Sequence, residues 1–177
     1  IAPKGAVVKV SGVKPSMHYF EGRARVFHSM EEASYAVSND QIKYGDILVI
    51  TYEGPKGGPG MREMHMTTSL IVGRGMDESC ALITDGRFSG STRGPCIGYI
   101  SPEAAAGGPI AAVEEGDKII IDIPDRTLTL CVPDEEIQRR LSQVKHIHKE
   151  ATPALRRYAA LVTSADQGAV LKTPDEL

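Results

Sequence analysis

The sequence predicts an α+β (mixed β/α) fold with a β-rich core, and three observations support this prediction. Short apolar runs bounded by turn residues outnumber the segments with helical spacing. The segments with helical spacing lie between predicted strands or near the end of the chain. Several links between successive strands are too short to hold a crossover helix, which disfavours a doubly wound parallel order.

The strands are predicted from apolar runs that end at glycine, proline or polar residues. The stretch 11–22 is expected to be a loop, because two glycines and a proline interrupt it. The last two strands are expected to form a hairpin around Pro124 and Asp125, although the proline leaves the turn type open. The predicted strands span residues 5–10, 24–27, 47–52, 81–84, 96–100, 118–123 and 126–132.

Helices are predicted where capping residues precede apolar residues at helical spacing. Ser29 is an expected N-cap, because Glu31 and Glu32 would then lie in the first turn. A helix is also expected to start at Ser101-Pro102-Glu103, and an amphipathic one at Pro133. Helices are predicted for residues 30–37, with Ala33, Ala36 and Val37 on the inner face, 61–72 and 153–162, and residues 165–177 are expected to be a tail.

Length and composition indicate one globular domain spanning 1–177, with a core of Val, Ile, Leu and Ala because aromatic residues make up only 5% of the chain. The net charge of −3 and the lack of a basic block argue against a nucleic-acid partner. No apolar run reaches membrane-spanning length, so no membrane partner is expected. Because Ile1 is not Met, we expect it to be an internal position of a longer chain or a processed start.

The cysteines are three in number: Cys80, Cys96 and Cys131. An odd number at wide spacing argues against a disulfide framework, and the lack of a CxxC pair argues against a zinc site. Each lies in an apolar stretch, so we expect buried thiols in a reducing cytoplasm.

The first glycine-rich loop, residues 52–64, contains four glycines and two prolines within residues 54–60. It follows a predicted strand and leads into a predicted helix, whose free N–H groups favour an anion. Glu63 is expected in the first turn of that helix, either as a carboxylate that complements the helix dipole or as a metal ligand, and position alone favours the former. The glycine spacing fits neither a Walker motif nor a dinucleotide-binding motif.

The second glycine-rich loop, residues 84–95, also follows a buried strand, where catalytic groups are common. Ser89 is expected to be exposed on a tight turn, but a serine hydroxyl needs nearby cations or N–H groups to act as a base. Arg87 and Arg93 are suited to binding a carboxylate. The alternative is that the hydroxyl residues only satisfy turn backbone groups. No hydrolase-triad spacing or nucleophile elbow is present.

The histidines contribute little to the predicted site. His146 and His148 would lie on different sides of a helix, so a surface role is expected rather than a metal pair. His65 follows Glu63 and could line the same cleft.

Several long motifs make the chain resemble the C-terminal region of the dihydroxy-acid/phosphogluconate dehydratase family. The motifs span residues 57–64, 84–90, 93–98 and 101–104, and residues 5–9 and 158–170 fit the same region. The resemblance covers essentially the whole chain. It implies a swivelling, partly open β-barrel flanked by helices, similar to the mobile domain of aconitase-type enzymes.

The resemblance also implies an activity, namely elimination of water from 2,3-dihydroxy carboxylic acids to give 2-keto acids. Such a hydro-lyase uses Mg²⁺ and an iron–sulfur cluster. Glu63 matches the family's Mg²⁺ ligand, Ser89 matches the serine whose alkoxide takes the C2 proton, and residues 89–93 (Ser89, Gly90, Ser91, Thr92 and Arg93) match the substrate-binding loop. None of the cysteines matches a cluster ligand, so the cluster is expected in a separate N-terminal domain.

The implied partners are therefore that N-terminal domain, a dihydroxy-acid substrate and further copies of the full-length protein, and this fragment alone is expected to be inactive. The sequence departs from the family at Ser91, where glycine is usual, and at residues 65–68, where a proline-containing segment is usual. The segment 55–60 favours branched-chain amino-acid (isoleucine and valine) biosynthesis. The alternatives are a gluconate- or arabinonate-type sugar-acid dehydratase domain and a non-catalytic anion-binding module. The dehydratase interpretation requires the side chains of Glu63 and Ser89 to face one shared cavity.

Overall fold

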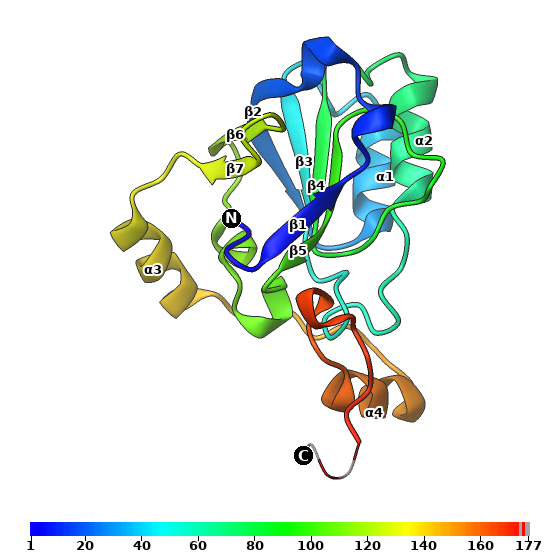
Figure 1. Cartoon of the computed structure of the whole chain (residues 1–177), viewed down its shortest axis with the longest axis vertical. Coiled ribbons are helices and arrows are strands. Elements are labelled where there is room, and N and C mark those ends of the chain that lie inside the picture. Colours follow the sequence, from blue (N-terminus) through cyan, green and yellow to red (C-terminus); the bar gives the residue numbers. More distant parts are fainter. Residues whose placement is uncertain (174, 176–177) are drawn as a thin grey trace.

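The architecture is a single mixed sheet, seen in a computed structural model that describes residues 1–173 and 175. Its seven strands lie in the order β1-β5-β4-β3-β2-β6-β7 (Figure 1). The pairs β2–β3, β3–β4 and β4–β5 are parallel, whereas β1–β5, β2–β6 and β6–β7 are antiparallel. The strands are β1 (Gly5–Val8), β2 (Tyr19–Phe27), β3 (Asp46–Ile50), β4 (Ala81–Thr84), β5 (Cys96–Ser101), β6 (Lys118–Asp122) and β7 (Thr127–Leu130).

Helices make two of the three parallel connections, whereas a loop links β4 to β5. These helices are α1 (Met30–Ser38), between β2 and β3, and α2 (His65–Gly73), between β3 and β4. Both cover the same face of the sheet (Figure 1). This follows from the strand order, because right-handed crossovers that proceed steadily toward one edge stay on one face. The sheet is therefore not doubly wound, as the sequence predicts.

Alternation along the central strands builds two apolar layers. Ile47 and Val49 point into one cluster, which also contains Ile83 and Ile110. The intervening Leu48 and Ile50 join the other cluster, which packs against the helices through residues that include Ala33, Ala36, Val37 and Ile71. Strands buried on both faces read as continuous apolar runs, and this is why β3 and β4 were recognisable in the sequence.

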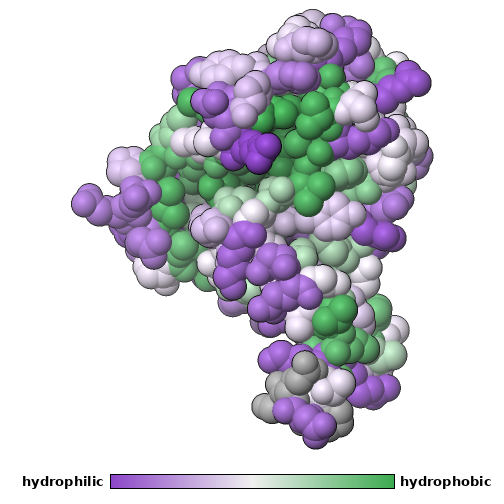
Figure 2. Space-filling view, in the orientation of Figure 1, coloured by the Kyte–Doolittle hydropathy of each residue, from purple (hydrophilic) through white to green (hydrophobic). Residues whose placement is uncertain are grey.

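The sheet curls, so that the segment before one edge strand reaches the other edge strand. Strands β1 and β7 are at opposite ends of the strand order, yet the amino group of Ile1, just before β1, donates to the Leu128 carbonyl of β7 at 3.0 Å. The result is a half-barrel flanked by helices, which confirms the predicted fold class. In Figure 2, hydrophobic residues gather over the upper centre of this face, and hydrophilic residues cover α3 (Asp134–Gln143) at the left.

Most predicted elements are present, and the differences have local causes. The helix starting at Ser29 is α1, capped as predicted by the Ser29 hydroxyl, which accepts from Glu32 N at 3.2 Å. The loop predicted for 11–22 is wrong at its end, because β2 begins at Tyr19 and pairs with β6 along its length. Gly22 lies within that strand, and a larger residue would not fit there because its Cβ would lie 2.5 Å from the Gly45 carbonyl oxygen.

Two predicted helix starts are wrong. The helix predicted for 61–72 begins only at His65, because Met61 has a left-handed φ of 51° and Met64 N donates to Arg87 O at 2.8 Å instead of within a helix. The start predicted at Ser101-Pro102-Glu103 gives only a 3-10 turn, Ala104–Ala106, because Gly107 turns the chain with a φ of 75°.

The C-terminal part follows the predictions more closely. Strands β6 and β7 form the expected hairpin, and α3 and α4 (Pro153–Leu161) lie where helices were predicted. The remaining short elements are 3-10 turns at Val10–Gly12, Pro15–Met17, Pro109–Ala112 and Ala165–Gln167. Part of the expected tail 165–177 folds back, since Lys172 N donates to Leu161 O at 2.9 Å, whereas residues 174, 176 and 177 lie outside the described residues.

The cysteines differ in their exposure to solvent. Cys80 and Cys96 are buried as predicted, but Cys131 is exposed. The prediction for Cys131 is wrong because the residue follows the buried Leu130 on the edge strand, and alternation turns its side chain outward. Among the described residues, no helix has the length and apolar character needed to cross a membrane.

Candidate functional site

The two glycine-rich loops meet at one edge of the sheet. The first follows β3 and the second follows β4, and these strands are parallel neighbours, so their carboxyl ends lie together. The loops pair directly, because Glu63 and Arg87 form a parallel bridge. Within it, Met64 N donates to Arg87 O at 2.8 Å and Arg87 N donates to Arg62 O at 3.3 Å. Backbone hydrogen bonds thus join the segment of Glu63 to the segment that leads to Ser89.

Glu63 lies at the seam between the two loops, where it forms the bridge with Arg87, and not in a helix. Its side chain is 40% exposed, and its nearest cationic partner is Arg87, whose Nη1 is 4.0 Å from Oε1. Because α2 begins two residues later, the interpretation of Glu63 as a carboxylate in a first helical turn is wrong. The alternative, a carboxylate available to a metal ion, is compatible with this exposed and weakly paired position.

Ser89 begins a tight turn. Thr92 N donates to the Ser89 carbonyl at 3.0 Å, which closes the turn over Gly90 and Ser91. Ser89 is half-buried as a residue, and its hydroxyl lies in an exposed contact 3.0 Å from the Ser91 hydroxyl and also accepts from Ser91 N at 3.3 Å. The turn therefore brings two groups that can donate, the hydroxyl and the backbone N–H of Ser91, to Ser89 Oγ.

The rest of the second loop is held by the N-terminal segment. Lys9 Nζ donates to the Gly90 carbonyl at 2.5 Å, and Gly94 N donates to Gly12 O at 2.9 Å. Thr92 is buried, and its hydroxyl makes no hydrogen bond to the described residues. Arg93 lies beside a small hollow next to Thr68 of α2. Of the residues predicted to bind substrate, Ser89 to Thr92 thus lie in one turn, whereas Arg93 follows that turn and lies beside Thr68.

Asp85, a residue not singled out from the sequence, begins the second loop and links it to the first. Its side chain is fully buried and accepts from three backbone N–H groups: Tyr52 at 3.1 Å, Glu53 at 2.9 Å and Ala104 at 2.9 Å. Burial raises the pKa of this carboxyl group to about 6, and the N–H donors oppose that rise. Its position directly after a buried strand was the only sequence signal.

A second buried carboxylate, Glu53, fixes the residue before Glu63. Glu53 Oε1 accepts from Met30 N at 3.0 Å and from Arg62 Nη2 at 2.9 Å, and Lys149 Nζ is 2.9 Å away. Arg62 also forms a two-pronged contact with Glu31, at 2.7 and 2.9 Å, and this contact lowers the pKa of Glu31 to about 2. The Glu63 segment is therefore anchored to α1 as well as to the second loop.

Glycines in the first loop let its backbone pack closely against two buried acidic residues. A Cβ on Gly58 would lie 2.7 Å from Glu53 Cα, and one on Gly54 would lie 2.7 Å from Glu103 Oε2. Glu103 accepts from Lys56 N at 2.9 Å and from Gly57 N at 2.8 Å. The N–H groups of Lys56 and Gly57 thus bind a carboxylate of the protein itself.

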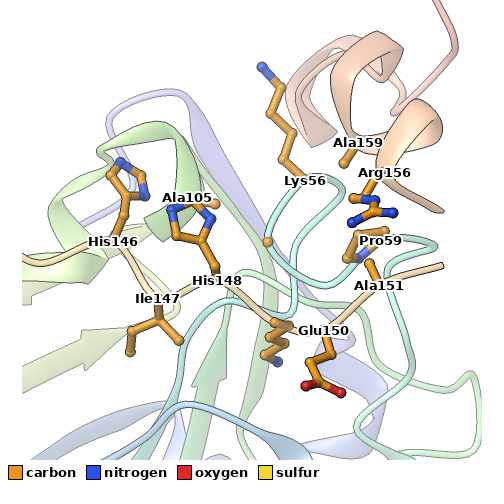
Figure 3. A pocket seen from close by; sticks show the side chains of 12 residues that line it. Lys56, Pro59, Ala105, His146, Ile147, His148, Glu150, Ala151, Arg156 and Ala159 are labelled. Atoms are coloured by element: carbon orange, nitrogen blue, oxygen red, sulfur yellow. The ribbon is translucent and has the colours of Figure 1, made fainter. Parts of the chain in front are cut away.

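A cavity of about 620 Å³ opens beside the first loop (Figure 3). His146 and His148 line it with ring centroids 6.1 Å apart, on an extended segment and not on the helix assumed from the sequence. Its lining is Lys56, Gly57, Pro59, Ala105, His146, Ile147, His148, Lys149, Glu150, Ala151, Arg156 and Ala159. Neither Glu63, Ser89 nor His65 is part of this lining, so the cavity is separate from the seam between the loops.

The donor groups fit one of the two implied cofactors. Glu63 offers one carboxylate that accepts no hydrogen bond from the described residues, which suits a single Mg²⁺ ligand completed by substrate oxygens and other groups. No set of three or more His, Cys, Asp or Glu side chains in the described part of the chain is arranged to hold a metal ion. The cysteines do not fit an iron–sulfur cluster, since Cys131 lies apart at the surface and burial raises the pKa of Cys96 to about 12.

Together these features define an α+β half-barrel domain that presents polar side chains on the loops following its parallel strands. Residues 1–169 match the family described as dihydroxy-acid/6-phosphogluconate dehydratase, C-terminal, and the chain belongs to that family. Over 173 residues it is 58% identical to a dihydroxy-acid dehydratase of Methanococcus aeolicus and 56% identical to those of Aquifex aeolicus and Syntrophotalea carbinolica. The matches cover 97% of this chain but only 31–32% of each relative.

Proposed function

We propose that this chain supplies part of the active site of a hydro-lyase that removes water from 2,3-dihydroxy carboxylic acids to give 2-keto acids. The observation that carries the proposal is the Glu63–Arg87 bridge, which joins the loop bearing the exposed Glu63 carboxylate to the loop bearing the Ser89 turn. The relatives named dihydroxy-acid dehydratase favour this substrate class and, with it, branched-chain amino-acid biosynthesis.

The proposed role of Ser89 is to take the proton from C2 of the substrate. Its Oγ accepts that proton as an alkoxide and becomes a hydroxyl group, while the electrons of the C2–H bond form the C2–C3 double bond of an enol. The C3 hydroxyl group leaves as hydroxide with the electron pair of the C3–O bond. The proton that Ser89 took from C2 is passed through solvent to this hydroxide, which gives one water and restores the Ser89 alkoxide, and the enol tautomerises to the 2-keto acid. A serine can do this only where donors and positive charge stabilise its alkoxide.

The other predicted residues have supporting roles in the proposal. Glu63 would hold Mg²⁺, which supplies positive charge for the substrate's oxygens when bound. Gly90, Ser91 and Thr92 form the turn that presents Ser89, so they are the proposed contacts to the substrate, with Arg93 at the loop's far end. We assign the iron–sulfur cluster, and with it the departure of the C3 hydroxyl, to the part of the protein that lies N-terminal to this domain.

The proposed setting is a longer cytoplasmic protein that assembles as a homo-oligomer. The family match to a C-terminal domain supports an N-terminal partner domain, because this chain spans about a third of the length of its relatives.

The test is Ser89→Ala in the full-length protein that carries this chain. We expect turnover of 2,3-dihydroxy-3-methylbutanoate to fall roughly 10²- to 10⁴-fold, since a general base contributes about that much, while the visible spectrum of the cluster stays unchanged. Ser142→Ala, an exposed serine on α3, is the matched control and should keep full activity. Normal turnover by Ser89→Ala would refute the assigned role. Faster turnover of gluconate or arabinonate by the parent protein would favour the sugar-acid alternative.

A further inference from the structure

Ser91 places two hydrogen-bond donors on the hydroxyl group of Ser89. Its backbone N–H points to Ser89 Oγ at 3.3 Å, and its own hydroxyl lies 3.0 Å from the same atom. Either hydroxyl can donate while both are neutral. Once Ser89 is an alkoxide it can only accept, so both Ser91 groups must then donate to it.

The fold holds Ser91 in this position. The hydrogen bond from Thr92 N to Ser89 O, 3.0 Å long, closes the turn and brings residue 91 back toward residue 89. Lys9 holds the middle of the turn through the Gly90 carbonyl. The contact from Ser91 to Ser89 is therefore part of a closed turn that is anchored at its centre.

We propose that Ser91 is a positioning residue that stabilises the alkoxide of Ser89 and so sets the pH at which the base becomes active. This inference rests on the proposed function of Ser89. Hydrogen bonds donated to a charged group favour that charged form, so the Ser91 hydroxyl lowers the pH needed to ionise Ser89.

The charged groups near the turn do not replace this donor. Lys9 Nζ is engaged by the Gly90 carbonyl, and Arg87, two residues before Ser89, has its Nη1 4.0 Å from the Glu63 carboxylate. Arg93 lies on the far side of the loop beside Thr68. These charges contribute equally with and without the Ser91 hydroxyl, so a variant that removes only this hydroxyl isolates its effect.

The experiment measures kcat against pH for the full-length protein, its Ser91→Ala and Ser91→Gly variants, and Ser91→Thr, which keeps the hydroxyl. We expect the acidic limb of the profile to move about one pH unit upward in the alanine and glycine variants, which is about tenfold in kcat on that limb. Ser91→Thr should restore the parent's limb, and the control Ser142→Ala should not shift it.

The possible results distinguish the role of Ser91 from the proposed role of Ser89, on which it rests. An unshifted limb in both variants, a loss of kcat equal at every pH, or a shift in Ser91→Thr as large as in Ser91→Ala would overturn the role of Ser91. Ser89→Ala is measured in the same series. If that variant keeps normal turnover, the role of Ser89 itself fails, whereas an inactive Ser89→Ala with an unshifted Ser91→Ala refutes only the role of Ser91.

Discussion

Asp85 links the start of the second glycine-rich loop to the first loop and to the segment after β5. It binds backbone N–H groups of Tyr52 and Glu53 after β3 and of Ala104 after β5, while itself following β4. A carboxylate offers two oxygens with several acceptor sites, so it can serve three donors at once. No neutral side chain of this size can do the same, which explains why an acidic residue occupies a fully buried position.

The raised pKa of Asp85 predicts a specific pH dependence of stability. Since the folded pKa of about 6 exceeds the ordinary value of 3.8, the contribution to stability is full below the ordinary pKa and is lost as pH rises through 6. Asp85→Asn abolishes this titration. We expect the difference in free energy of unfolding between the parent and Asp85→Asn to be larger at pH 5 than at pH 7, by about 1 kcal/mol. Urea unfolding of the full-length protein checks this, and an equal or smaller difference at pH 5 would contradict it.

At the scale of elements, α1 is tied to the first loop through Glu53 and Arg62. Met30 N, at the start of α1, donates to Glu53, and Arg62 connects Glu53 to Glu31 in the first turn. The sequence predicted α1 and its cap correctly, because Ser29, Glu31 and Glu32 act locally. It missed the link to the loop, because the partners are distant in sequence and meet only after the sheet has formed.

The two carboxylates that bind Arg62 are predicted to differ in their contribution to stability. Glu53 is fully buried, whereas the side chain of Glu31 is 57% exposed. Glu53→Gln should cost about 3–5 kcal/mol, because it removes the buried counter-charge of Lys149 and leaves Arg62 with Glu31 alone. Glu31→Gln should cost about 1 kcal/mol or less. Urea unfolding of both full-length variants measures the difference, and equal losses would show that burial does not govern this pair.

The late start of α2 is another result of packing between elements. Apolar residues from Met61 onward have helical spacing, but Met64 N binds Arg87 O and the backbone at Met61 is left-handed. Pairing with the second loop thus overrides a local preference. This difference matters for function, because it moves Glu63 from a helical turn to the seam between the loops.

At the scale of the whole molecule, the N-terminal segment supports the Ser89 turn across the fold. A Cβ added to Gly12 would lie 2.7 Å from the Thr92 carbonyl oxygen, and Gly12 O accepts from Gly94 N. Pairing of β1 with β5, the strand that follows the second loop, brings these segments together.

Gly12→Ala is therefore predicted to impair turnover without touching any proposed catalytic group. The new methyl group must displace the backbone at Thr92, and displacements of about 1 Å in an active site can cost on the order of 10²-fold. Gly73→Ala is the matched control, because an added Cβ at the end of α2 meets no atom within 4 Å. Steady-state kinetics of both full-length variants tests this. Unchanged kcat in Gly12→Ala would show that the turn does not depend on this contact.

The sequence by itself determined the α+β class, the apolar central strands and the two loops, because alternation, capping and glycine content act over a few residues. The candidate roles of Glu63 and Ser89 came from resemblance carried by contiguous motifs, and they remain proposals. Only the tertiary structure decided that the two loops pair, that Asp85 and Glu53 lie buried beneath them, and that Ser91 faces Ser89. The bridge between the loops and the buried carboxylates depend on contacts between distant segments, and burial, which shifts the pKa of Asp85, exists only once the sheet has curled and packed.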